Sequence, residues 1–324
     1  MDGTKLKDSD KGFELKLRPR MLSEFIGHDD VVRRLKVIIN AAKGRNEAMG
    51  HILLHGPPGL GKTTLASILA EEMGSSLVTT SGPALEKAGD LAGILTNLAE
   101  NDLFFIDEIH RMTRNMEEYL YPAMEDFRLD LMIDSGTNAR SVQVSLNHFS
   151  LIGATTKVGN LSSPLRSRFP IIIRLEYYDL ANLTEIVFRS AKILGCETNR
   201  EAAEAIAKRS RGTPRVANNL LRWVRDYAQL HNENQIDLSC VREACQMIKV
   251  DEVGLDEMDK RILEMIIDLH DGGPVGLKTI AQTLGEDETT LAEVYEPYLI
   301  MQGFIKRGPR GREVTKFAYE HLGY

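Results

Sequence analysis

The sequence lacks any long hydrophobic run. No uninterrupted apolar stretch approaches 18 residues, whereas a helix that crosses a bilayer needs about 20. Residues 1–16 are polar and charged and lack the apolar centre of a secretory signal. We therefore expect no membrane segment and a cytoplasmic location.

Cysteine is scarce as well. The 324 residues include only Cys196, Cys240 and Cys245. Cys240 and Cys245 lie five residues apart in a helix-like stretch without histidines at metal-binding spacing. This content excludes a disulfide framework, disfavours a metal site and predicts buried thiols in a reducing compartment.

An excess of positive charge is also missing. The formal net charge of −7 argues against a protein that coats nucleic acid through bulk electrostatics, although it permits a local basic patch. A hydrophobic content of 43% with 27% charged residues is typical of a globular protein. The length predicts two or three domains.

The sequence does contain a complete phosphate-binding motif. Residues 52–54 are typical of a buried strand, residues 56–63 match G-x-x-x-x-G-K-[ST], and apolar residues then recur at helical spacing. This strand–loop–helix context favours nucleotide binding over a simple glycine–proline turn. Lys62 is placed to reach the β- and γ-phosphates, and the Thr63 hydroxyl to bind Mg²⁺. We expect ATP and Mg²⁺ as cofactors.

A second buried strand supplies carboxylates. The apolar run 103–106 ends in Asp107 and Glu108, and the carboxyl ends of parallel strands open at a ligand-binding crevice. We expect Asp107 to hold Mg²⁺, directly or through water, and Glu108 to polarise the attacking water. Hydroxyl groups at residues 155–156 follow the apolar run 149–153 and should lie beside the same crevice.

The order of expected elements indicates three domains. Strands and helices alternate up to residue 179, which predicts a parallel sheet with helices on both faces. Residues 180–250 are typical of an all-helical domain, and residues 251–324 predict a winged-helix variant of helix-turn-helix. We expect residues 1–12 to be disordered.

Residues 128–147 interrupt the α/β pattern with two alternating runs joined by a turn-rich link, which predicts an inserted hairpin. The hairpin is either a plain sheet edge or a protruding contact element. In the second case Leu131, Ile133, Val142 or Val144 would be exposed on one face.

A basic cluster marks the expected wing. Lys306, Arg307, Arg310 and Arg312 are close in sequence, and they form either a solvated hairpin tip or a phosphate-binding surface for DNA.

Two further arginines have open interpretations. Arg168, in the proline-bounded segment 162–170, is either a solvated surface charge or a site residue. Arg215 follows Pro214 in the first turn of an expected helix, where the helix dipole disfavours a cation. That placement hints at a site.

Taken together, the motifs resemble one family. GPPGLGKTTLA, LFFIDEIHR, YPAMEDF, GATT, SPLRSRF, RSRGTPR and PRGR are similar to motifs of AAA+ ATPases, and in particular of the RuvB family of bacterial Holliday-junction branch-migration motors. The resemblance extends from about Leu17 to the end of the chain. It implies an α/β fold with an AAA+ P-loop parallel-sheet domain, a small helical lid domain and a C-terminal winged-helix domain.

The resemblance also implies residue roles. Thr156 would be a first sensor, Arg215 a second sensor, and Arg168 an arginine finger inserted into the neighbouring subunit's site. Arg307 and Arg312 would contact DNA, with Arg310 between them on the wing. The nucleotide would be contacted by residues spread over the first two domains: Leu17, Arg18, Gly59, Leu60, Gly61, Lys62, Thr63, Thr64, Asp107, Glu125, Asp126, Phe127, Tyr178 and Arg215.

One segment departs from the family pattern. Residues 286–288 are acidic where some relatives carry a basic residue, so no DNA contact is carried over to Glu288.

Partners are implied in the same way. They are duplex DNA at a Holliday junction, RuvA docked on the hairpin 128–147, RuvC in a resolving complex, and further copies of the chain in a homohexamer. The implied processes are DNA recombination, DNA repair and the SOS response.

Three functions compete at this point: a DNA-translocating motor, a nucleotide-gated switch or loader without translocation, and a winged-helix module with a vestigial ATPase. The complete set of site residues disfavours the third. Motor and switch share these residues, and the resemblance favours the motor.

Overall fold

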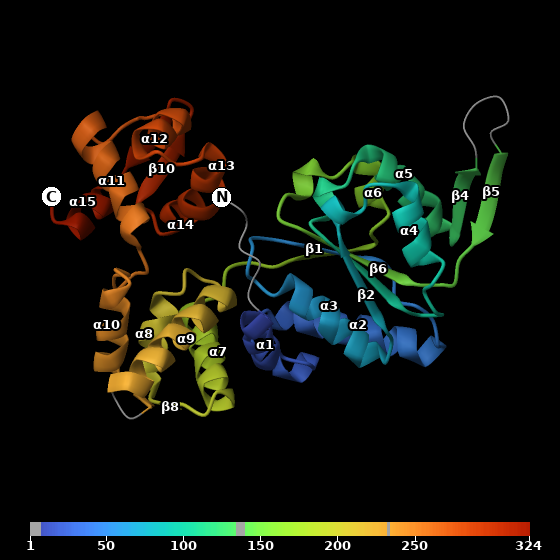
Figure 1. Ribbon diagram of the computed structural model, residues 1–324, viewed down its shortest axis with the longest axis horizontal. Coiled ribbons are helices and arrows are strands. Elements are labelled where there is room, and N and C mark those ends of the chain that lie inside the picture. Colours follow the sequence, from blue (N-terminus) through green and yellow to red (C-terminus); the bar gives the residue numbers. More distant parts are fainter. Residues whose placement is uncertain (1–7, 134–139, 232–233) are drawn as a thin grey trace. The chain divides into compact units, whose positions relative to one another are not determined.

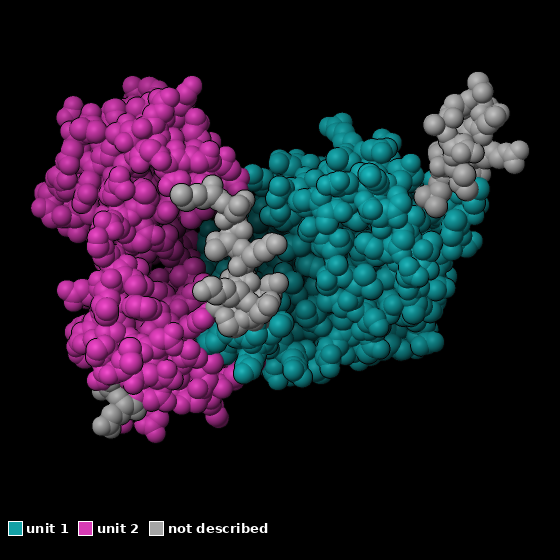
Figure 2. Space-filling view, in the orientation of Figure 1, with its two compact units in different colours: residues 1–186, 213–215 teal, residues 187–212, 216–324 magenta. Residues whose placement is uncertain are grey.

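The computed structural model describes residues 8–133, 140–231 and 234–324. The chain divides into two compact units, residues 1–186 with 213–215 and residues 187–212 with 216–324 (Figure 2). The three-domain boundaries expected at residues 179 and 250 remain predictions.

The first unit is built on a parallel sheet of five strands in the order β2-β3-β6-β1-β7. The central strands β1, β3 and β6 are almost wholly buried, as expected for parallel strands covered on both faces. The predicted α/β class is thus confirmed. The strands are β1 (Ile52–His55), β2 (Leu77–Ser81), β3 (Leu103–Asp107), β6 (Ser150–Thr155) and β7 (Ile171–Arg174).

Helices cover both faces of this sheet (Figure 1). Leu53, Phe104, Ile106 and Leu151 share one apolar core with helices α4 and α5. Their sequence neighbours alternate to the opposite face, which α2 and α3 cover. The helices are α2 (Asp29–Arg45) and α3 (Lys62–Met73) on one face, and α4 (Ala88–Leu95), α5 (Arg114–Glu125) and α6 (Ser163–Ser167) on the other.

The N-terminal segment corrects one expectation. Residues 8–12, expected to be disordered, belong to helix α1 (Asp8–Leu17), and residues 1–7 of that prediction lie outside the described residues. The N-cap of α2 is His28, and Asp29 and Asp30 occupy its first turn. Acidic residues are favourable there because they face the positive end of the helix dipole.

The predicted hairpin is confirmed as a separate antiparallel pair, β4 (Arg128–Ile133) and β5 (Arg140–Ser145) (Figure 1). Leu129 pairs with Val144, and both pack on the core of the first unit. The next pair on the same face joins Leu131 to Val142, and Val142 is exposed. The side chains of Leu131 and Ile133 lie outside the described part of the chain. The inner half of the hairpin is therefore anchored, and its apolar face continues outward.

The second unit is mainly helical. Its first part departs from the all-helical expectation through the short parallel pair β8 (Glu197–Thr198) and β9 (Gln235–Ile236). α7 (Leu180–Ile193) starts in the first unit and continues into the second. The remaining helices of this part are α8 (Arg200–Lys208), α9 (Pro214–His231) and α10 (Leu238–Met247).

The rest of the second unit has the predicted winged-helix arrangement around an apolar core that includes Leu263, Ile266, Leu299 and Phe304. Its final helix was not predicted. The elements are α11 (Glu257–His270), α12 (Leu277–Leu284), α13 (Glu288–Thr290), a π-helical turn (Leu291–Tyr295), α14 (Glu296–Met301), β10 (Ile305–Gly308), β11 (Gly311–Val314) and α15 (Lys316–Leu322). Among all the described helices, none has the length and apolar character needed to cross a membrane.

His51 fastens the amino end of β1 to α5. Its side chain is buried; Nδ1 accepts the Leu151 N–H at 2.9 Å, and Nε2 donates to the Met124 carbonyl at 3.0 Å. The acceptor role of Nδ1 requires a neutral ring, and burial lowers the pKa of His51 below its ordinary value.

This arrangement predicts a pH dependence of stability. The folded chain holds His51 neutral, so its contribution is fully present above the unfolded pKa of about 6.5 and is lost as the pH falls below that value. The free energy of unfolding should decrease from pH 7 to pH 5. In His51→Gln the decrease should be shallower, by at most about 1.4 kcal/mol per pH unit for the one proton.

Urea unfolding followed by circular dichroism at several pH values measures this slope. His231→Gln, which changes an exposed histidine, is the control and should keep the original slope. Equal slopes for His51→Gln and the unmodified chain would contradict the assignment.

Candidate nucleotide and nucleic-acid sites

The phosphate loop joins β1 to α3. Its glycines Gly56, Gly59 and Gly61 all have positive φ angles, of 145°, 79° and 96°. At Gly56 a Cβ atom would lie 2.2 Å from the Leu175 carbonyl oxygen. Only glycine permits this path of the backbone, which turns the chain into the start of α3 as an anion-binding loop requires.

Lys62 begins α3 and points back into this loop. Its side chain is buried, and Nζ donates to the carbonyl oxygens of Gly56 and Pro57, each at 2.8 Å. Burial lowers the pKa of Lys62 to about 8; Asp107 and Glu108 oppose the shift and Arg215 adds to it. A partly desolvated ammonium group is thus held where an incoming phosphate would compensate its charge.

The two acidic residues stand at the end of β3. Asp107 Oδ1 accepts the Glu108 N–H at 2.9 Å. Glu108 has a positive φ of 47°, and its Oε2 accepts a 2.9 Å hydrogen bond from Arg111. Arg111 was not predicted. Because both partners are about half exposed, the pair adds little stability, but it directs the Glu108 carboxylate.

A hydroxyl-bearing strand lies between the carboxylates and the phosphate loop, because β6 pairs with both β3 and β1. Thr155 ends this strand and is buried; its Oγ1 shares a 2.9 Å hydrogen bond with His110 Nδ1 and accepts the Lys157 N–H at 2.9 Å. Thr156 follows and is exposed. Thr155 therefore has a structural role, and Thr156 remains the candidate sensor. His110 is a further residue that the sequence interpretation missed.

Arg215 reaches the phosphate loop from the start of α9. Residues 213–215 belong to the first compact unit, and the Arg215 N–H donates to the Gly59 carbonyl at 3.4 Å. A Cβ atom on Gly59 would lie 3.1 Å from Cβ of Arg215. This contact agrees with the predicted start of the helix and leaves the guanidinium beside the loop.

An aromatic group flanks the other side of the loop. Tyr178 is buried, donates to the Leu60 carbonyl at 3.5 Å and packs edge-on against His28 at 4.6 Å between ring centroids. The Phe25 ring lies 3.5 Å from the Cβ position of Gly61. Phe25 and His28 were missed, and the only signal for them was their place around Gly27. Of the other expected contacts, Leu17 is buried and Arg18 half-buried.

The oxygen atoms of Thr63 and Asp107 suit Mg²⁺. Mg²⁺ prefers a few hard protein oxygens together with substrate phosphates, and a hydroxyl at the start of α3 and a carboxylate at the end of β3 supply that donor set. No cluster of three or more potential metal-ligating side chains occurs in the described part of the chain.

Glu125, Asp126 and Phe127 lie at the opposite edge of the sheet. The Phe127 ring packs against the rings of His148 and Phe149, with centroids 4.3 Å and 5.8 Å apart. His148 and Phe149 lie just before the amino end of β6. The phosphate loop, in contrast, follows the carboxyl end of β1. These three residues therefore lie away from the phosphate loop of their own chain, and their contact with a nucleotide stays a prediction.

Arg168 shares this edge. Its guanidinium pairs with Glu125 Oε2 at 3.0 Å, donates to the Pro164 carbonyl at 2.8 Å and stacks over the Tyr121 ring at 4.3 Å. The residue ends the short helix α6 rather than an open turn, so its side chain folds against α5. It is not a freely solvated surface charge.

The basic residues of the wing differ in their exposure to solvent. Lys306, Arg307 and Arg310 are exposed. The Arg312 side chain is 12% exposed and bonds Glu296, itself 6% exposed, through two hydrogen bonds of 3.0 and 2.9 Å. In this structure Arg312 therefore anchors β11 to α14. The DNA contacts of Arg307, Arg310 and Arg312 stay predictions.

Family profiles match nearly the whole chain. The profile described as the Holliday junction DNA helicase RuvB P-loop domain matches residues 17–175. The RuvB AAA lid domain matches residues 178–251, and the RuvB C-terminal winged helix domain matches residues 252–323.

Individual proteins similar to this chain carry the same family name. The Holliday junction branch migration complex subunit RuvB of Protochlamydia amoebophila is 60% identical over 317 residues, covering 98% of this chain and 96% of the relative. The protein of the same name from Parabacteroides distasonis is 56% identical over 319 residues, covering 98% and 94%. The solved Thermotoga maritima RuvB Holliday junction branch migration motor superposes with a TM-score of 0.86 at 48% identity, covering 95% of this chain and 99% of that one.

The two wing arginines should respond differently to truncation. Arg312→Ala leaves Glu296 buried without its partner, which costs about 3–5 kcal/mol, so the thermal transition of the winged-helix part should fall. Arg307→Ala removes an exposed side chain and should change stability by about 0.5 kcal/mol or less. It should instead weaken duplex binding for unrelated sequences and lower the salt-dependence slope by about 1.

Calorimetry and fluorescence anisotropy at several salt concentrations measure the two effects. Native stability combined with weakened DNA binding in Arg312→Ala would show that Arg312 contacts DNA and does not act as an anchor.

Proposed function

The chain belongs to the RuvB family of Holliday junction branch migration motors. From that premise we propose which residues bind ATP, which hydrolyse it and which contact partners. It is a nucleotide-binding P-loop ATPase that drives branch migration in DNA recombination and repair. The observation that carries the assignment of roles is the geometry around one phosphate loop. Lys62 is held by the Gly56 and Pro57 carbonyls, the Arg215 N–H donates to the Gly59 carbonyl, and the strand that ends in Asp107 is separated from β1 only by β6.

We assign binding and hydrolysis to different members of this group. Lys62 and Arg215 bind the phosphates of ATP, and Tyr178 packs behind the loop where the nucleoside enters. Thr63 and Asp107 would hold Mg²⁺, which neutralises phosphate charge when bound. Glu108 accepts a hydrogen bond from the attacking water and draws its proton, and Thr156 orients the reacting groups.

Arg168 serves a different subunit in this proposal. It precedes β7 by three residues, and Ile171 of β7 is in register with Ile52 of β1. The phosphate loop begins only after β1, so at least about 13 Å of strand, at about 3.3 Å per residue, separates the two sites. Arg168 is out of reach of its own nucleotide, but a head-to-tail ring places such an edge against the next subunit's site.

The same geometry accounts for Glu125, Asp126 and Phe127. They adjoin Arg168, so in a ring they would face the neighbour's nucleotide together with it. We propose a homohexamer, in agreement with the family resemblance, with each nucleotide held between two subunits.

The hairpin and the wing supply the partner surfaces of the proposed machine. Val142 is 41% exposed on the outward face of the hairpin, which suits docking of RuvA, and Lys306, Arg307 and Arg310 suit the phosphates of duplex DNA. RuvC would join at the junction, and the cytoplasm is the proposed location.

Glu108→Gln tests the assignment of hydrolysis. The amide keeps the shape of the side chain but cannot take a proton, so ATP binding should persist while turnover falls about 10²–10⁴-fold. ATP-driven dissociation of a synthetic four-way DNA junction should stop with it. Lys62→Ala is the contrasting control, because it should lose ATP binding itself. Normal turnover in Glu108→Gln would remove Glu108 from catalysis, and turnover without dissociation in the unmodified chain would favour the switch or loader.

Subunit mixing tests the placement of Arg168. Arg168→Ala should bind ATP nearly normally and hydrolyse it about 10³–10⁵-fold more slowly, the range for a finger that acts in the transition state. Mixing with Lys62→Ala protein should restore part of the activity, because some sites then combine an intact Lys62 with an intact neighbouring Arg168. No recovery in rings shown to be mixed would exclude action across the interface.

A further inference from the structure

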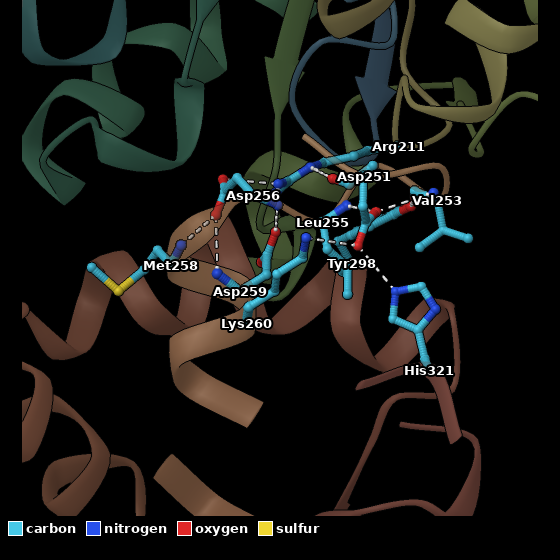
Figure 3. A network of polar contacts seen from close by, with 11 residues as sticks. Arg211, Asp251, Val253, Leu255, Asp256, Met258, Asp259, Lys260, Tyr298 and His321 are labelled. Atoms are coloured by element: carbon cyan, nitrogen blue, oxygen red, sulfur yellow. Dashed lines mark hydrogen bonds and ion pairs between the residues drawn. The ribbon is translucent and has the colours of Figure 1, made fainter. Parts of the chain in front are cut away.

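Arg211 is the centre of a polar network in the second unit (Figure 3). It lies between α8 and α9, and its Nη2 reaches Asp256 Oδ2 at 2.9 Å and Asp259 Oδ2 at 2.5 Å. Its Nε donates to the Gly254 carbonyl at 3.0 Å, and its guanidinium lies over the Tyr298 ring at 5.0 Å. One side chain thus joins the loop before α9 to the first helix and to α14 of the winged-helix part.

The Asp259 carboxylate, which Arg211 contacts, is buried at a cost in free energy. The Asp259 side chain is 0% exposed. Oδ2 accepts from Arg211 and from the Asp256 N–H at 3.0 Å, whereas Oδ1 has no hydrogen-bond partner among the described residues. Burial raises the pKa of Asp259 to about 7, although Arg211 opposes the shift. A buried ion pair of this kind adds less stability than a well-packed apolar pair of similar size, so its value lies in fixing geometry.

The segment that follows α10 is fixed as well. Gly254 packs so closely on the backbone of Arg209 that a Cβ atom would lie 2.6 Å from the Arg209 carbonyl oxygen. Asp251 accepts the Leu255 N–H at 2.9 Å and pairs with Lys260 at 3.3 Å and His321 at 3.0 Å. Contacts on both sides therefore hold this connection between the lid helices and the winged helix.

Arg211 is also close in sequence to the nucleotide site. It has a left-handed φ of 52° and is followed by Gly212 at 71°, a backbone conformation that is costly for a residue with a side chain. Residues 213–215 then pack with the first unit, where Arg215 adjoins Gly59. The strained residue held by two carboxylates is therefore four positions from the cation beside the phosphate loop.

We infer that Arg211 is a positioning residue, which clamps the turn before Arg215 onto α11 so that the phosphate-contacting arginine and the DNA-binding winged helix move together. The inference rests on the proposed function, in which Arg215 binds nucleotide and the wing binds DNA. Loss of the clamp should leave both sites present but make ATP hydrolysis less productive in moving DNA.

The test measures junctions dissociated per ATP hydrolysed, with the full-length protein and a synthetic four-way DNA. This quantity is a ratio, so a loss of folded protein lowers both terms and leaves it unchanged. We expect Arg211→Ala to lower the ratio about tenfold, within the 5–150-fold range of typical coupling energies. Asp259→Asn, which keeps the shape but removes the charge, should lower it less and provides a second variant if Arg211→Ala folds poorly.

Arg225→Ala is the matched control. Arg225 belongs to the same unit, has a side-chain exposure of 21% against 17% for Arg211, and pairs with Asp226 at 2.6 Å far along α9 from the turn. Its ratio should equal that of the unmodified chain. An unchanged ratio in both Arg211→Ala and Asp259→Asn would overturn the inference, as would an equal fall in Arg225→Ala. Failure of the proposed function is distinguishable, because the unmodified chain itself would then dissociate no junctions with ATP.

Discussion

The common direction of the five strands in the central sheet is the constraint on which the rest of the first unit depends. Because all strands run parallel, their carboxyl ends gather the phosphate loop, the carboxylates of β3 and the hydroxyls of β6 at one edge. Their amino ends gather Arg168 and Glu125 at the other. In the proposed function a single chain therefore supplies the phosphate-binding part of one site and, at the opposite edge, the cation that would complete a neighbour's site. The proposed ring is the arrangement that would bring both edges to one nucleotide.

Desolvation sets the electrostatics of the binding edge. Lys62 is buried by the loop that it serves, and only backbone carbonyls and the nearby carboxylates compensate its charge. Such a group gains more from an incoming phosphate than an exposed lysine would, because the cost of removing it from water has already been met by folding. The two carbonyl oxygens hold the ammonium inside the loop, and in the proposed function this supplies the preorganisation that electrostatic catalysis requires.

The sequence was sufficient wherever function depends on local pattern. The phosphate loop, the strand ending in Asp107, the hairpin and the wing all carry a signal within ten or twenty residues, and each lies where predicted. The failures concern tertiary partners. Nothing near Arg312 shows that Glu296 will bury it, and nothing near Glu125 shows that it pairs with Arg168 across 43 positions. Helix α1 was missed because its residues are polar, and local composition there resembles that of a disordered segment.

Three arginines illustrate how the exposure of the partner carboxylate determines how firmly an arginine side chain is held. Arg211 and Arg312 pair with carboxylates that are 0% and 6% exposed. Breaking either pair therefore leaves a buried charge without a partner and costs several kcal/mol. The partner of Arg168 is Glu125, which is 55% exposed, so water can solvate that carboxylate as soon as the pair separates. In its proposed role Arg168 would leave one anion for another in every catalytic cycle, which needs the second kind of partner. An arginine that transmits position from one domain to the next needs the first, because a clamp that opened easily would transmit nothing.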